Sequence, residues 1–217
     1  MANEDSFITE VSDEVRRERL FGYLRRYGWI AILAVIVLVG GAAFNEWRKA
    51  QARAQAEALG DGILQALEGD DAAARVEALG ALEADGTGAA ILSMIRSAQQ
   101  AEAGDRAAAI AQVQAIAGNG TIDALYRDLA VLKLVQLQGE DVSPADRRAR
   151  LEPLTARGAP YRPLALELIA LSHVDDGDTE AALAVLNDIL ADGETPQGLR
   201  RRASQLIVAL GGTLSAT

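Results

Sequence analysis

The feature that most constrains the fold is a run of nineteen uncharged residues, Tyr27 to Asn45, enclosed by Arg26 and Glu46. At ~1.5 Å of rise per residue, a helix of this length extends roughly 28 Å, close to the ~30 Å hydrocarbon core of a bilayer. Nine of its residues are Ile, Leu, Val or Phe, and together they favour insertion by about 3–5 kcal/mol. The run therefore predicts a transmembrane helix over residues 28–45.

The residues that flank the run indicate where the interfaces lie and how the span is oriented. Aromatic rings gather at membrane interfaces, and basic residues gather on the cytoplasmic side. Five basic residues precede the run and three follow it closely, which favours a cytoplasmic amino terminus. The predicted interface residues are Trp29, Trp47, Arg25 and Arg26.

Two other interpretations of the run are a cleaved signal peptide and a buried core helix. A signal peptide has a short basic leader, whereas this leader has 27 residues and carries six acidic ones. A core helix would show a polar face, which this run lacks. We favour the membrane anchor, with residues 1–27 as a cytoplasmic tail that is irregular rather than a short amphipathic helix.

The rest of the chain is predicted to be all-α. Alanine and leucine supply most of the apolar residues and only 4% of the chain is aromatic, a composition that favours helix over strand. Residues 46–68 contain no proline and predict a helix that links the span to the following domain. The absence of cysteine excludes disulfides and thiolate metal sites.

An internal repeat organises residues 69–211. Glycine–acid pairs recur at Gly69-Asp70, Gly104-Asp105, Gly139-Glu140 and Gly177-Asp178, with spacings of 35, 35 and 38 residues. A period of this length is typical of a helical-hairpin solenoid. The glycine can end one helix in the left-handed conformation and the acid can cap the next helix. A single globular helical bundle is the alternative, and residues 212–217 are predicted to be a frayed tail.

Several local signals place the helices within this repeat. Ser143-Pro144 and Thr195-Pro196 each combine a capping residue with a proline at the first helical position. Pro153 is expected to end or kink its helix. Alanine follows three of the four glycines by five residues, at Ala74, Ala109 and Ala182. The predicted helices are 70–84, 88–103, 105–117, 122–138, 144–157, 160–174, 178–191 and 196–210.

The chain as a whole resembles a known bacterial family. The segments EVRRERL, YGW and NEWRKAQ around a single span, followed by helical repeats, resemble the ancillary subunits of the Sec translocon. The resemblance implies a single-pass protein of the cell inner membrane with a periplasmic tetratricopeptide-like domain. It also implies protein partners, which would be translocon subunits, periplasmic chaperones or emerging chains.

Resemblance to tetratricopeptide domains also implies a binding surface. In such domains the first helix of each hairpin lines a concave face. Alignment of the repeats places seven candidates for partner binding on that face. Core packing is the competing interpretation, and for the two leucines it is at least as well supported. These candidates are Met94, Ala98, Leu129, Lys133, Gln136, Glu167 and Leu171.

The sequence offers no constellation for catalysis, and we expect no enzyme activity, metal or cofactor. The single histidine, His173, is interpreted as a polar residue near the end of a helix, because a metal site needs more ligands. Arg200-Arg201-Arg202 could dock an acidic partner, but a solvated face is favoured. The net charge of −10 argues against binding nucleic acid.

Two functions remain open. The first is a membrane-anchored scaffold that binds proteins at the translocon, where residues 54–217, with 24 acidic and 13 basic residues, would prefer basic or apolar segments. The second is a cell-envelope or division protein that forms a homo-oligomer through its repeats.

Overall fold

The computed structural model describes the backbone of residues 4–213 and the side chains of residues 25–26, 29–30 and 32–213. The chain divides into two compact units, Met1–Glu57 and Ala58–Thr217. All regular structure in the described residues is helical, as the composition predicts. Of the predicted frayed tail, residues 212–213 are irregular, and residues 214–217 lie outside the described residues.

The first unit is formed by α1 (Glu4–Leu67), whose last turns belong to the second unit. Residues 4–27 are helical in the structure, although an irregular tail is favoured from the sequence. Within the described residues, no helix combines the length and the apolar character that crossing a membrane requires. The apolar side chains that are described in this unit are exposed, among them Trp29 at 63% and Leu38 at 73%.

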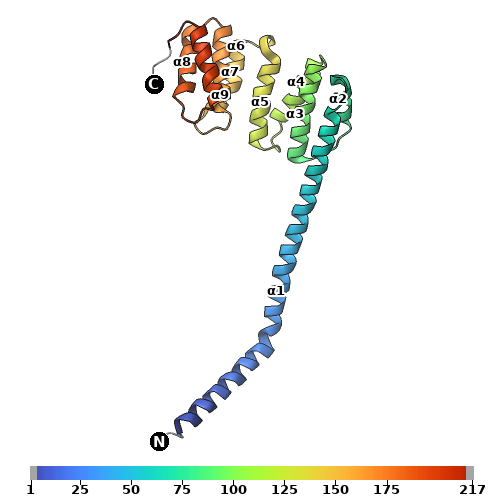
Figure 1. The fold of residues 1–217 in the computed structure, drawn as a ribbon, viewed down its shortest axis with the longest axis vertical. Coiled ribbons are helices and arrows are strands. Elements are labelled where there is room, and N and C mark those ends of the chain that lie inside the picture. Colours follow the sequence, from blue (N-terminus) through green and yellow to red (C-terminus); the bar gives the residue numbers. More distant parts are fainter. Residues whose placement is uncertain (1–3, 214–217) are drawn as a thin grey trace. The chain divides into compact units, whose positions relative to one another are not determined.

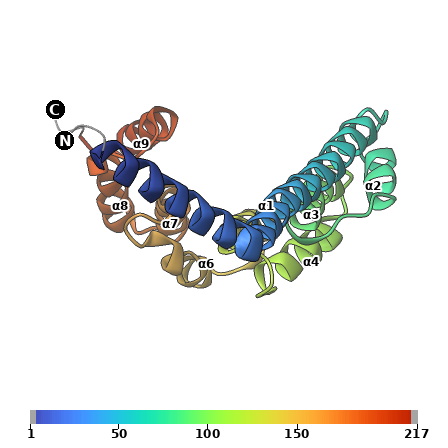
Figure 2. The same ribbon diagram turned by 90° about the horizontal axis from the view of Figure 1, so that it is seen from below.

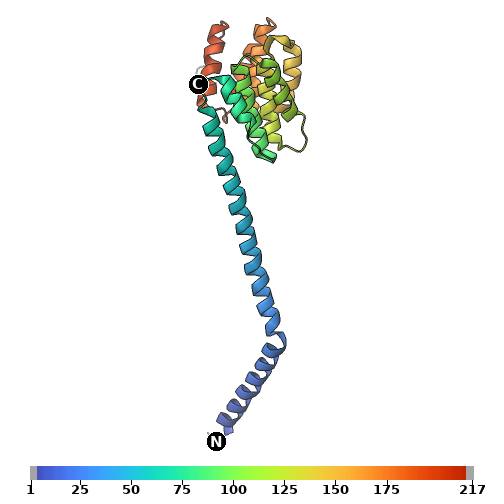
Figure 3. The ribbon, with the colours of Figure 1, turned by 90° about the vertical axis from the view of Figure 1, so that its right-hand side faces the viewer.

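The second unit is a stack of helical hairpins that follow one another in chain order (Figure 1). It holds α2 (Ala72–Gly80), α3 (Gly86–Glu102), α4 (Arg106–Ala117), α5 (Ala124–Gln138), α6 (Pro144–Leu151), α7 (Arg162–Asp175), α8 (Thr179–Ala191) and α9 (Gln197–Ala209). Short 3-10 helices, Gly139–Asp141 and Glu152–Thr155, flank α6. In Figure 2 these helices form an arc from α2 to α9, and Figure 3 shows them running along roughly one common direction.

The predicted capping residues begin three of the helices, α4, α6 and α8. Asp105 and Asp178 accept hydrogen bonds from the backbone of the third residue after each, at 3.0 Å. The glycines before them have positive φ values, 87° at Gly104 and 77° at Gly177, a conformation that glycine adopts at little cost. Ser143 caps α6 in the same way, by accepting from the Asp146 backbone N–H at 3.1 Å.

Three of the local predictions need correction. The cap of α2 is Asp71 rather than Asp70, and α2 ends at Gly80 rather than at residue 84. Thr195 is not the cap of α9: it is buried, and its hydroxyl bonds none of the described residues. The helix begins at Gln197, because Pro196 has an extended backbone with ψ of 144°.

The hydrophobic core is a chain of four clusters, each shared by consecutive elements. The first joins the end of α1 to α2 and α3, and the second joins α3, α4 and α5. The third joins α5, α6 and α7, and the fourth joins α7, α8 and α9. Since neighbouring clusters have a helix in common, each hairpin is buried mainly by the hairpins next to it, which is the packing of a solenoid.

Arginines reinforce the contacts between successive hairpins. Arg106 of α4 donates to the carbonyl oxygens of Leu137 and Gln138, at 2.5 and 2.6 Å, where α5 ends. Arg148 of α6 donates to the Ser172 carbonyl oxygen near the end of α7, at 3.1 Å. The last carbonyls of a helix lack partners within the helix, so each arginine ties one hairpin to the open end of the next.

Candidate protein-binding surface

The predicted binding residues lie on the first helices of three hairpins, which are α3, α5 and α7. Their places repeat relative to the glycine that ends each hairpin's first helix. Ala98 and Leu171 each lie six residues before that glycine, and Met94 and Glu167 each lie ten before it. The repeat alignment therefore assigns them to equivalent sides of their helices.

Burial separates these candidates into core and surface residues. Met94 is only 6% exposed and packs against α4 and α5 in the second core cluster, as the competing interpretation of core packing describes. Leu129 is half-buried and packs against the same cluster. Leu171 remains 39% exposed. Ala98 and Gln136 are also exposed, and Lys133 is half-buried.

Glu167 is occupied by an intramolecular ion pair. Its two carboxylate oxygens accept from Nε and Nη2 of Arg202 on α9, at 2.7 and 2.8 Å. This bidentate contact with an acidic side chain raises the pKa of the Arg202 guanidinium. Glu167 keeps only 17% of its side chain exposed, whereas Arg202 keeps 54%. A partner at this position would therefore meet the arginine more readily than the glutamate.

Contacts within the repeat unit hold two of the three arginines at residues 200–202. Arg200 donates to the carbonyl oxygens of Leu190 and Asp192, at 2.6 and 2.9 Å, where α8 ends. Arg202 is held by Glu167, and Arg201 is exposed and pairs with none of the described residues. Two of the three arginines thus serve the fold, and they do not form one docking cluster.

Three exposed apolar side chains on the first helices, Ile91, Leu125 and Leu164, were not among the predicted residues. Ile91 and Leu164 each lie thirteen residues before the glycine of their hairpin, at 37% and 40% exposure. Leu125 of α5 is 40% exposed near the same level. Leu164 and Leu171 are seven residues apart and therefore share one side of α7. The spacing from the glycines could have identified these residues. We call Ile91, Ala98, Leu125, Gln136, Leu164 and Leu171 the first-helix surface.

Two titratable side chains lie near the ends of α7, His173 and Tyr161. His173 lies in the last turn of α7, with Nδ1 3.7 Å from an oxygen of Asp178. The described residues contain no group of three or more side chains that could hold a metal ion. Burial, and then the nearby Tyr126 and Asp128, raise the pKa of Tyr161.

Comparison with known proteins gives one match. Residues 22–156 match the family model described as a tetratricopeptide repeat-like domain. The matched range includes the apolar run of α1 and the helices through α6. No curated protein and no solved structure matches the chain.

Proposed function

The chain belongs to the family of proteins with a tetratricopeptide repeat-like domain, and from this premise we propose that it is a membrane-anchored, non-enzymatic scaffold that binds proteins on the periplasmic side of a bacterial inner membrane. Domains of this family are protein-interaction scaffolds, so protein partners in general follow from membership. The anchor, the compartment and the identity of the partners are the further parts of the proposal. The observation that carries it is the exposure of four large apolar side chains, Ile91, Leu125, Leu164 and Leu171, on the first helices α3, α5 and α7.

The apolar run supports the anchor. Nineteen consecutive residues carry no charge, and those whose side chains are described expose large apolar groups in series from Ile32 to Val39. Exposing such apolar surface to water is unfavourable in free energy, whereas placing it in the bilayer core is favourable. The family model begins at residue 22, so the run is part of what the chain shares with the family.

The excess of basic residues before the run supports the orientation. Five arginines precede it, and the three basic residues after it are Arg48, Lys49 and Arg53. Basic residues near a span remain on the cytoplasmic side. This orientation would put the repeat unit in the periplasm, where the absence of cysteine avoids unwanted disulfides.

Charge and tethering support partners of a particular kind. Residues 54–217 carry 24 acidic and 13 basic residues, so the repeat unit attracts basic segments and repels acidic ones. Confinement beside a channel raises the effective concentration of the scaffold towards emerging chains, so weak contacts suffice. The resemblance of residues 14–49 to ancillary translocon subunits supports the Sec channel and its chaperones as partners.

Site-specific crosslinking in native membranes tests this proposal. A photo-crosslinking residue is placed at Leu171 or Leu164 on the first-helix surface, and at the exposed Gln114 of α4 as a matched control. We expect translocon subunits, chaperones or emerging chains to be captured from the first two positions and not from Gln114. Capture of only a second copy of the chain would favour the self-associating envelope protein, and capture of no protein would refute the scaffold.

A further inference from the structure

Two large apolar side chains of the repeat unit are more exposed than the others that the structure describes. They are Leu64 at 66% and Val208 at 59%, whereas those on the first-helix surface lie between 37% and 40%. Leu64 is in the last turns of α1 and Val208 is in α9, so they belong to the first and the last described helix of the stack. Figure 2 shows α2, which packs against the end of α1, at one end of the arc and α9 at the other.

The end of the stack that holds Leu64 is acidic. Asp61 lies one turn before Leu64, Gln65 is the next residue, and all three share the exposed side of α1. Residues 58–85, which form the first hairpin, carry seven acidic residues and only one basic residue, Arg75. We call Asp61, Leu64 and Gln65 the acidic end face.

The end of the stack that holds Val208 is basic. α9 buries one side against α7 and α8. Arg201, Gln205 and Val208 are four and three residues apart and share the exposed side. Residues 196–213 contain three arginines and no acidic residue, and Arg201 pairs with none of the described residues. We call Arg201, Gln205 and Val208 the basic end face.

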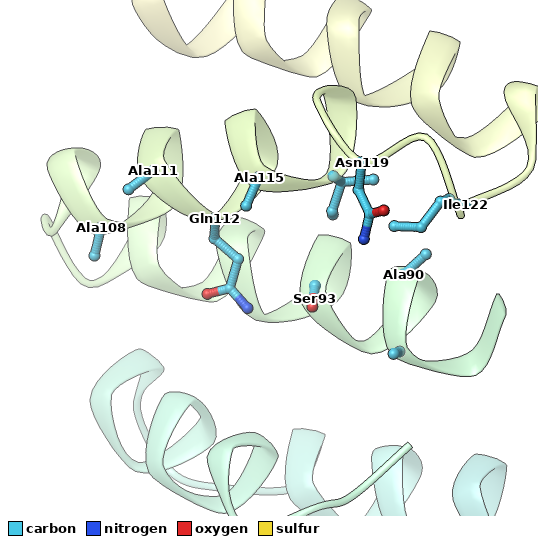
Figure 4. A pocket seen from close by; sticks show the side chains of 10 residues that line it. Ala90, Ser93, Ala108, Ala111, Gln112, Ala115, Asn119 and Ile122 are labelled. Carbon is cyan, nitrogen blue, oxygen red and sulfur yellow. The ribbon is translucent and has the colours of Figure 1, made fainter. Parts of the chain in front are cut away.

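These faces are unusual places for exposed apolar groups. The outermost hairpins of a repeat stack normally have a polar outer surface, because no neighbour covers them. Burying a leucine or valine side chain is favourable by about 1.5–3 kcal/mol. In the middle of the stack, by contrast, the hollow between α3 and α4 is uncharged and is lined mostly by alanine and serine (Figure 4). Each end face therefore combines an apolar side chain that is more than half exposed with a charge opposite to that of the other end.

We propose that the acidic end face of one chain docks against the basic end face of a second copy, so that repeat units join head to tail. Leu64 and Val208 pack together in this contact, and Arg201 of one chain faces Asp61 of the other. A symmetric contact is disfavoured, because two acidic faces or two basic faces repel each other. A head-to-tail pair keeps one unused face of each kind, so further copies can add to form a ring or an open row.

This contact goes beyond the proposed function and does not depend on it. It uses neither Leu164 nor Leu171, so the first-helix surface stays accessible to protein partners in each copy. A contact between two helix faces is small, and we expect it to be weak in dilute solution and stronger where chains are confined together.

Cysteine crosslinking tests the inference, because the chain contains no cysteine. Full-length chains with Gln65→Cys and full-length chains with Gln205→Cys carry different epitope tags, are produced in the same cells, and are treated with a short bismaleimide in native membranes. Both positions lie on the end faces and leave Leu64 and Val208 unchanged. We expect covalent dimers that carry both tags. Gln114→Cys, at an exposed glutamine of α4, replaces Gln65→Cys as the control and should give only background dimer.

Reversing single charges provides the matched comparison. Arg201→Glu, placed in the chain with the α9 cysteine, faces Asp61 with a like charge and should lower the yield of mixed dimer by roughly two- to tenfold. Asp61→Arg in the other chain should then restore the yield, because the pair is recreated with its signs exchanged. Val208→Asn removes the apolar contact and should also lower the yield. Arg157→Glu makes the same change of net charge at an exposed arginine between the two ends and should leave it unchanged.

Three results would overturn the inference and leave the scaffold itself standing. The first is a mixed yield no higher than that of the control position, and the second is dimers that form mainly between two chains with the same cysteine. The third is an equal loss of yield with Arg201→Glu and with Arg157→Glu. Failure of the crosslinks expected from the first-helix surface would instead refute the proposed function, and it would not affect the mixed dimer.

Discussion

At the scale of single residues, positions that correspond in the repeated sequence differ in how deeply they are buried. Alanine follows the hairpin glycine by five residues at Ala74, Ala109 and Ala182, which predicts close helix contact at all three. Ala109 and Ala182 are completely buried, but Ala74 is exposed. The difference arises because α2 is short, with nine residues and only Leu79 buried.

Replacing each of these alanines by leucine should change the free energy of unfolding by different amounts at the buried and the exposed positions. Ala109→Leu or Ala182→Leu would overpack the core and should lower the free energy of unfolding by about 1–3 kcal/mol. Ala74→Leu adds the same atoms at an exposed site and should change it by less than about 0.5 kcal/mol. Urea unfolding of the full-length chain, followed by circular dichroism, measures these values. Equal losses at all three positions would contradict the assigned burial.

The hairpin glycine with positive φ gives a second residue-scale prediction. Gly104→Ala forces an alanine to adopt φ of 87° and should cost roughly 1–2 kcal/mol of stability. Gly118→Ala is the control, because Gly118 has φ of −86° and its new Cβ would lie 3.5 Å from the Gln114 carbonyl oxygen. That change should be neutral or stabilising by up to about 1 kcal/mol. The same unfolding measurement tests both.

Tyr161 should make stability fall at high pH. Burial raises its pKa in the folded state above the ordinary value of 10.0. Below pH 10 the phenol is protonated in both states, and its contribution to stability is fully present. As the pH rises from 10 through the folded pKa, the unfolded state releases the proton first, and this contribution is lost. Tyr161→Phe should show a shallower decline in melting temperature over that window, and identical pH profiles would exclude the effect.

At the scale of helices and turns, local signals in the sequence locate the elements well. Each of the eight predicted helices has a counterpart, and Pro153 ends its helix as expected, at the start of a 3-10 turn. These predictions depend on neighbouring residues, such as a cap and the backbone it bonds. The reach of Arg106 to α5 and of Arg202 to Glu167 could not be predicted, because each contact joins residues more than 30 positions apart.

The arginine at the start of α4 should stabilise the end of α5. Arg106→Met removes the hydrogen bonds to Leu137 and Gln138 and the 2.9 Å ion pair with Asp141. Because Arg106 is exposed, the loss should be about 1 kcal/mol, and hydrogen exchange should become faster in the last turn of α5. Arg201→Met, at an exposed arginine without such contacts, should change neither quantity.

At the scale of the whole molecule, the sequence predicts the class of architecture better than the binding surface. The glycine–acid period predicts stacked hairpins, and four linked core clusters confirm them. The period also assigns residues to the first helices, but it does not reveal that Met94 is buried or that Glu167 is paired. Which side chains are buried between helices depends on packing, which the spacing of residues along the chain does not encode.

The proposed anchor gives a prediction for the whole chain. We expect the full-length protein to stay with membranes through alkaline carbonate extraction. Val35→Arg with Leu38→Arg adds about 5–7 kcal/mol to the cost of insertion, more than the whole run favours it, and should release the protein. Gln51→Arg with Gln55→Arg adds the same charges outside the run and should leave it bound. Extraction of the unaltered chain would exclude the anchor.

The linked clusters have a mechanical consequence for the repeat unit. A pull on the carboxyl-terminal end loads the cluster of α7, α8 and α9 first, whereas the first and second clusters share no residue with it. The stack should therefore yield in steps, one hairpin at a time, and should recoil in the reverse order when the load is released. A partner that pulls on this end would extend the repeat unit from α9 inwards, while the hairpins nearest α1 stay folded.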